Sequence, residues 1–162
     1  MKSHVHSISP EKNRARGFTL IEVLLVVAII AILAGITIVA INPARQYDQA
    51  KNSERISHVN TILNAVHQYA LDNGGVLPAS IPVGDTCTGD AAYEICQTGA
   101  SCASGVDLSP LTASEVYLVS IPIDPEESGS TGTGYNIVQS TNGRITVCAP
   151  AADLSQDISV KR

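Results

Sequence analysis

Glu22 is the residue whose position in this sequence most demands a chemical explanation. It is the single ionisable side chain within the apolar stretch of residues 18–41. A carboxylate inside a membrane-spanning helix costs about 2.5–3.5 kcal/mol on insertion scales, so such a residue is a functional-site hypothesis by default. The alternative is a charge close enough to the lipid headgroups to be tolerated. The position of Glu22 alone does not decide between these two interpretations.

The cysteines Cys87, Cys96, Cys102 and Cys148 are the second group of side chains that could do chemistry. All four follow the apolar stretch, none has C-x-x-C spacing, and four cysteines allow three pairings. The short segment QTGAS between Cys96 and Cys102 contains a glycine able to turn, so we predict a Cys96–Cys102 disulfide. A Cys87–Cys148 disulfide would then tie the loop to the last strand.

Other patterns of reactive residues are weak. His58 and His67 are nine positions apart, which does not place them on adjacent turns of one helix face, so we expect no zinc site. Asp124, Glu126 and Glu127 could help to hold Ca²⁺, but they lack the alternation of an EF-hand loop and are more typical of a solvated acidic turn. No nucleophile elbow or glycine-rich phosphate loop is present. We therefore predict neither an enzyme nor a resident cofactor.

Composition excludes several further classes of function. Aromatic residues make up 4% of the 162 residues and tryptophan is absent, which argues against a stacking platform for single-stranded nucleic acid. The formal net charge of −5 argues against a polyanion as the main partner. The hydrophobic share of 44% excludes disorder of the whole chain.

The apolar stretch is the element that must position Glu22. A hydrocarbon core about 30 Å thick needs about 20 helical residues, so residues 18–41 can span it. Four basic side chains and Glu11 give residues 1–17 a net charge of +3, whereas six basic and fourteen acidic side chains give the remainder −8. The positive-inside rule then predicts a cytoplasmic N-terminus and an extracytoplasmic head. A conventional secretory signal is disfavoured, because its apolar core is shorter, about 7–15 residues, and no small-x-small cleavage site precedes Asn42-Pro43.

Beyond Pro43 the sequence predicts an amphipathic helix that ends at residues 72–75, Asp-Asn-Gly-Gly. One continuous or proline-kinked helix over residues 18–72 would be about 80 Å long, so its outer half must pack on something. Its apolar stripe, near the 3.6-residue period, consists of Tyr47, Ala50, Val59, Ile62, Leu63, Val66, Tyr69 and Ala70. The residues assigned outside the stripe are Lys51, Glu54, Arg55, Asn60 and Gln68.

The C-terminal part of the sequence is typical of a loop followed by a sheet. Residues 77–107 are rich in Gly, Pro, Ser and Thr, and residues 116–121 are a short strand candidate. Residues 135–140 and 144–149 alternate apolar and polar side chains around Asn142-Gly143, which predicts a β-hairpin. A long helix backed by a small antiparallel sheet is an α+β fold.

The segment RARGFTLIEVLLVVAIIAILA, residues 14–34, resembles the N-terminus of the type IV pilin and pseudopilin family. The resemblance implies that a prepilin peptidase cuts the Gly17–Phe18 bond, that Phe18 becomes N-methylated, and that Glu22 is the fifth residue of the mature chain. It further implies a long helix packed on a small sheet. The implied partners are identical subunits, the prepilin peptidase and methyltransferase, and a pilus or secretion assembly platform.

The resemblance has a physical rationale. Cleavage would create an amine at Phe18 that is largely cationic at neutral pH. On one helix, Phe18 and Glu22 would share a face, so the carboxylate of one subunit could meet the amine of the next and set the axial register. The small residues Ala28, Ala31 and Gly35 form a strip that would let helices approach each other.

We thus expect a leader at residues 1–17, a membrane and assembly helix at 18–41, an amphipathic extension at 42–75 and a disulfide-stapled head at 76–162. The expected function is a structural subunit of a type IV pilus-like or type II secretion-like filament. The alternative is a minor pilin, or a monomeric tethered domain that binds DNA or a surface. Many pilins have a proline nearer the cleavage point than Pro43, so the sequence leaves open where the helix unwinds in a filament.

Overall fold

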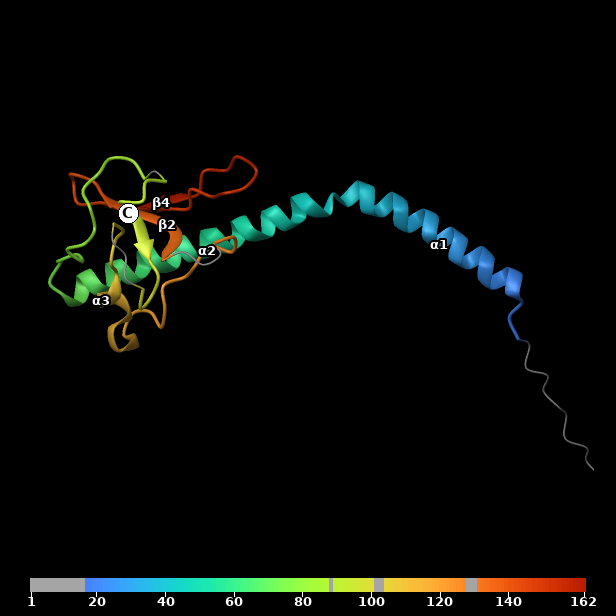
Figure 1. Ribbon diagram of the computed structural model, residues 1–162, viewed down its shortest axis with the longest axis horizontal. Helices are drawn as coiled ribbons and strands as arrows, with labels where there is room; N and C mark the ends of the chain where they lie inside the picture. The colour runs from blue at the N-terminus through green and yellow to red at the C-terminus, as the bar shows by residue number, and fades with distance from the viewer. Residues whose placement is uncertain (1–16, 88, 101–103, 128–130) are drawn as a thin grey trace, which may run out of the picture. The chain divides into compact units, whose positions relative to one another are not determined.

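The computed structural model describes residues 17–87, 89–100, 104–127 and 131–162 (Figure 1). The chain divides into two compact units, one that ends at Asn42 and one formed by Pro43–Arg162. We describe each unit by itself.

The first unit contains the helix α1, Leu20–Ile41. Thr19 is its N-cap, so the helix begins two residues later than predicted. It ends at Asn42, whose backbone is left-handed, with φ 48° and ψ 76°. Asparagine tolerates this conformation, and Pro43 has no N–H group with which to continue the helical hydrogen bonds. The predicted two-part helix over residues 18–72 is confirmed, with the interruption at Asn42, directly before Pro43.

The second unit begins with the helix α2, Pro43–Asp72, which ends where the sequence predicts. After Asp72 the backbone N–H of Gly75 donates to the carbonyl of Ala70 at 2.7 Å. Gly74 between them has a positive φ of 66°, a conformation that costs glycine little.

The buried face of α2 differs from the predicted stripe at its N-terminal end. Val59, Ile62, Leu63 and Val66 are buried as expected. However, Tyr47 is 65% exposed and Ala50 is also exposed. The polar side chains Lys51, Asn52 and Arg55, of which Lys51 and Arg55 were assigned outside the stripe, are buried instead. Carboxylates of Asp124, Glu126 and Asp153, which lie in two loops, cover this part of the helix. A pattern of hydrophobic residues in α2 cannot predict contacts with such distant charges.

The sheet has four antiparallel strands in the order β1-β2-β3-β4. The strands are β1, Glu94–Cys96; β2, Gly132–Gln139; β3, Ile145–Cys148; and β4, Ser159–Lys161. The predicted hairpin is confirmed as β2 and β3, with Gln139 opposite Ile145 and the N–H of Gly143 bonded to the carbonyl of Ser140 at 2.8 Å.

The helix α2 packs against β3 and β4 (Figure 1). Its buried side chains share one core with Tyr135 and Ile137 of β2 and with Ile145 and Val147 of β3. The fold class is therefore α+β, as predicted.

Two parts of the head depart from the prediction. Residues 116–121 are not a strand; they follow the short helix α3, Ser109–Thr112, and the 3-10 turn η1, Ala113–Glu115. Val116 and Val119 are 64% and 72% exposed, so the apolar residues of this segment do not all face the core. The strands β1 and β4, the first inside the predicted loop, were not anticipated. Each has three residues, too few for an alternating pattern to stand out.

Candidate functional site

The N-terminal end of α1 contains the residues for which the sequence predicts processing. Gly17, Phe18 and Thr19 are not helical. Thr19 has extended backbone, with φ −83° and ψ 150°. Its side-chain Oγ1 and its carbonyl accept the N–H of Glu22 at 3.3 Å and 3.1 Å, and the carbonyl also accepts the N–H of Val23 at 3.3 Å. A capping side chain satisfies an N–H group that has no partner within the helix.

Phe18 and Glu22 lie on the same side of this helix end, though not as predicted. Because α1 begins at Leu20, Phe18 is not a helical neighbour of Glu22. The two side chains nevertheless line one surface hollow of about 290 Å³ together with Val23, Val26 and Val27. Phe18 is 82% exposed. The backbone between them thus departs from a helix and still leaves both residues on one surface.

The surface of α1 is apolar, and among the described residues its side chains are exposed. None of its residues is buried. Ala28, Ala31 and Gly35 are exposed, and a Cβ atom added at Gly35 would meet no heavy atom within 4 Å. By length and composition, α1 is the one helix in the described residues that could cross a membrane. The role of these three small residues in packing between helices stays a prediction.

A buried ion cluster in the head was missed by the sequence analysis. Arg55 is 0% exposed, and all five of its N–H donors are used. Nε and Nη2 donate to the two carboxylate oxygens of Asp124 at 2.7 Å and 3.0 Å. Nη1 donates to Asp153 at 2.7 Å and to Asn52 at 3.1 Å, and Nη2 also donates to Glu126 at 2.8 Å. These contacts fix the loops that contain Asp124 and Asp153 to one turn of α2.

Lys51 extends the same cluster. Its Nζ lies 2.7 Å from Glu126, 2.8 Å from Asp153 and 3.2 Å from Asp48. Hydrogen bonds to Asp153 and Glu126 raise the pKa of Lys51 above its ordinary value. Hydrogen bonds from Lys51 first, and from Arg55 second, lower the pKa values of both Asp153 and Glu126. These shifts favour the charged forms of Lys51, Asp153 and Glu126 at neutral pH.

This cluster also gives two of the acidic residues considered for Ca²⁺ another role. Asp124 is buried and bonded to Arg55, and Glu126 bonds to both Lys51 and Arg55. Glu127 is partly buried. No group of three or more metal-ligating side chains in a suitable arrangement occurs in the described parts of the chain. The acidic turn is thus an ion-pairing segment rather than the solvated turn that we expected.

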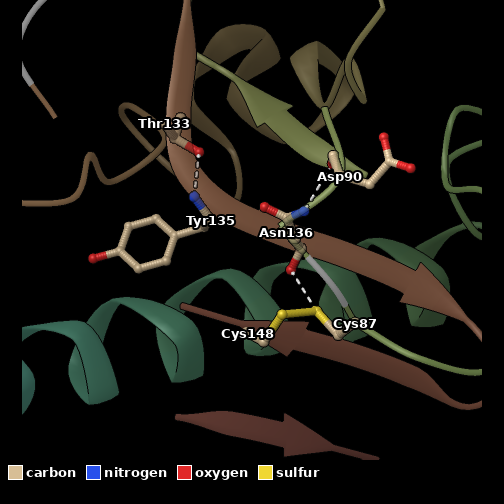
Figure 2. The surroundings of a disulfide bond; sticks show 6 residues. All are labelled: Cys87, Asp90, Thr133, Tyr135, Asn136 and Cys148. Carbon is tan, nitrogen blue, oxygen red and sulfur yellow. Dashed lines mark hydrogen bonds between the residues drawn. A yellow bond between two sulfur atoms is a disulfide. The ribbon is translucent and has the colours of Figure 1, made fainter. Parts of the chain in front are cut away.

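The predicted Cys87–Cys148 disulfide is confirmed, and it joins the loop before β1 to the end of β3 (Figure 2). Cys87 Sγ lies 3.4 Å from the carbonyl oxygen of Asn136, whose side chain donates to the carbonyl of Asp90 at 2.9 Å. Cys96 is also disulfide-bonded. The Cys96–Cys102 pairing stays a prediction, since Cys102 lies outside the described residues.

The histidines have separate surroundings. His58 Nδ1 is 2.8 Å from the hydroxyl of Tyr135, and its Nε2 is 3.8 Å from Glu54. Burial raises the pKa of Tyr135, whose side chain is fully covered. His67 Nε2 is buried and has no hydrogen-bond partner in the described residues. These contacts do not bring His58 and His67 into one site.

Comparison with known proteins bears on the N-terminal segment alone. The family model of the prokaryotic N-terminal methylation motif matches residues 12–38. No curated protein and no solved structure matches the chain. The match spans the non-helical residues Gly17 and Phe18, the charge at Glu22 and most of α1. The chain therefore carries the prepilin-type N-terminal methylation motif that marks type IV pilins and pseudopilins, and this motif includes most of a helix long and apolar enough to span a membrane.

Proposed function

We propose that this protein is a structural subunit that polymerises through α1 into a type IV pilus-like or type II secretion-like filament. The observation that carries the proposal is Glu22, a charge in the first turn of an otherwise apolar and uncovered helix within the methylation motif. A monomeric tethered domain would gain nothing from this charge, which makes insertion into a membrane harder.

The proposed sequence of events begins with the precursor in the cytoplasmic membrane. Prepilin peptidase hydrolyses the Gly17–Phe18 bond, so the carbonyl of Gly17 leaves as a carboxylate and Phe18 gains a free amine. Methylation of this amine adds a methyl group and leaves the nitrogen able to carry a proton. The positive charge at Phe18 then lies beside the hollow that it shares with Glu22.

Assembly follows from the charges and the exposed surface. In a bundle of identical helices, the Glu22 carboxylate of one subunit meets the Phe18 amine of the next. An uncompensated buried charge is strongly unfavourable, so this pairing selects one axial register. The rest of α1 exchanges lipid for neighbouring helices, and Ala28, Ala31 and Gly35 allow close approach. The head then lies outside the cytoplasm, as a surface or periplasmic part of the filament.

The proposal is tested by shearing filaments from cells, examining them by electron microscopy and analysing their main protein band by mass spectrometry. We expect this chain, beginning at a methylated Phe18, to be the main band. If filaments form normally without the chain, it is not their bulk subunit. Filaments that appear on the cell surface indicate a pilus, whereas their appearance only when the chain is overproduced indicates a secretion-type pseudopilus.

A further inference from the structure

Thr19 is the N-cap of α1 and lies one residue after the predicted cleavage point. Both of its oxygens accept the N–H of Glu22, and its own backbone is extended. The first helical residue is Leu20. The Gly17–Phe18 bond therefore lies in non-helical backbone, two residues before the helix.

This conformation matters for peptide hydrolysis. The attacking water must reach the carbonyl carbon, and a peptidase must contact the backbone on both sides of that bond. In an α-helix each carbonyl is hydrogen-bonded to the N–H four residues later and is enclosed by adjacent turns. A membrane favours such internal hydrogen bonds wherever the sequence permits them, and Phe18 is not a helix breaker. A capping residue ends the helix and satisfies an N–H group of the first turn that has no partner within the helix.

We propose that Thr19 is a positioning residue for processing, whose N-cap keeps residues 17–19 as a non-helical recognition segment for the peptidase. The inference rests on the proposed function, because it assumes cleavage at Gly17–Phe18. It requires capping ability rather than a direct contact between the peptidase and the threonine hydroxyl. Other good capping residues at position 19 therefore support cleavage.

A series of substitutions in the full-length precursor tests the proposal. Thr19→Val preserves the shape of the side chain and removes the capping oxygen, whereas Thr19→Ser and Thr19→Asn retain a cap. With purified prepilin peptidase and precursor in liposomes, we expect kcat/KM to fall about fivefold for Thr19→Val, the factor that corresponds to loss of a typical N-cap. We expect Ser and Asn to stay within about twofold of the unsubstituted chain. Thr37→Val is the matched control, because Thr37 bonds within α1 to the carbonyl of Ala34 at 2.9 Å and should not affect cleavage.

A second measurement reports the backbone itself. The ¹³Cα chemical shifts of Phe18 and Thr19 in the intact precursor should move towards helical values in Thr19→Val and stay non-helical in Thr19→Ser and Thr19→Asn. Cleavage of Thr19→Val at the unsubstituted rate, or failure of Thr19→Asn alongside normal chemical shifts, would overturn the inference and leave the proposed function intact. An unsubstituted precursor that is not cut at Gly17–Phe18 would overturn both.

Discussion

Arg55 in the ion cluster and Glu22 in the apolar helix α1 differ in whether an opposite charge lies near them in the subunit. Arg55 is compensated entirely within the subunit by Asp124, Asp153 and Glu126. Glu22 has no ion pair in the described residues. A charge that is satisfied internally stabilises one fold, whereas a charge without an internal partner favours association. This difference separates the residue that holds the head together from the residue that we assign to assembly.

The first residue-scale prediction concerns processing. Replacing Gly17 by leucine should leave the precursor uncut, because the resemblance implies that the peptidase needs a small residue before the cleaved bond. The measurement is the intact mass of the chain recovered from membranes. Gly35→Ala is the control, since a Cβ atom at Gly35 meets open space. A mature Gly17→Leu chain that begins at Phe18 would refute the assigned cleavage site.

The second residue-scale prediction concerns Arg55. Arg55→Met removes the partner of Asp124, which is 3% exposed, and leaves an uncompensated buried carboxylate. We expect the free energy of unfolding of the head to fall by about 3–5 kcal/mol. All five tyrosines lie in residues 43–162, so tyrosine fluorescence during urea unfolding of the detergent-solubilised chain reports on the second unit, which consists of α2 and the head.

Two further variants control this measurement. Arg55→Lys should recover only part of the loss, because lysine has three donors and cannot form the bidentate contact to Asp124. Arg144→Met removes an exposed arginine and should have little effect. Equal stability of Arg55→Met and the unsubstituted chain would show that the ion cluster is dispensable.

At the scale of elements, the prediction succeeded where local signals were strong. Asn142-Gly143 between alternating segments predicted the β2–β3 hairpin, and Gly74-Gly75 predicted the end of α2. The prediction failed where tertiary contacts determine which residues of α2 are buried. The carboxylates that bury Lys51 and Arg55 come from loops 69 to 102 positions away in the sequence. A periodicity argument excludes charged residues from a buried face, so it could not identify this turn of α2 as part of the interior.

A second contact between segments far apart in the sequence is the close approach of β2 to the acidic turn that contains Asp124. Gly134 has φ +77°, and a Cβ atom there would lie 2.8 Å from Cβ of Asp124. A larger residue would push Asp124 away from Arg55 and would be strained in this conformation. The ion pair of Asp124 therefore depends on the absence of a side chain at Gly134 of β2. A local sequence pattern does not indicate this dependence.

The element-scale prediction concerns the Cys87–Cys148 disulfide, whose cysteines are 61 residues apart. In the chain-entropy model a bridge closing a loop of this length stabilises the folded state by about 4 kcal/mol. Cys87→Ser combined with Cys148→Ser should lower the urea midpoint of the head accordingly. Peptide mapping without reductant should find the Cys87–Cys148 peptide in the unsubstituted chain. An unchanged midpoint would mean that the sheet and α2 hold this loop without the bridge.

At the scale of the whole molecule, the sequence alone predicts more of the structure of the first unit than of the second. The apolar helix, its single charge and the methylation motif could be predicted because membrane insertion and a short motif impose them directly. The head was readable as α+β, but its ion cluster, the outer strands β1 and β4 and the non-strand segment 116–121 depend on contacts that form only in the folded domain.

The whole-molecule prediction concerns pH. The pKa values of Asp153 and Glu126 are lowered in the folded head by Lys51 and Arg55. A carboxyl group with a lowered folded pKa contributes stability that is present above its unfolded pKa, about 4, and is lost as pH falls towards the folded value. The urea midpoint should therefore be constant between about pH 6 and 8 and fall below about pH 5. Asp153→Asn should reduce this fall, and an identical acid profile for that variant would contradict the assignment.

The most direct test of the account is the ratio of filament-borne to membrane-borne chain for Glu22→Gln. The substitution removes the charge, nearly preserves the shape and makes membrane insertion easier. Glu54→Gln, which neutralises an exposed carboxylate of α2, is the control. The account predicts normal insertion and normal cleavage at Gly17–Phe18, checked on the same gel, with a large drop in filament-borne chain for Glu22→Gln alone. Normal filament yield from Glu22→Gln would contradict assembly by charge pairing.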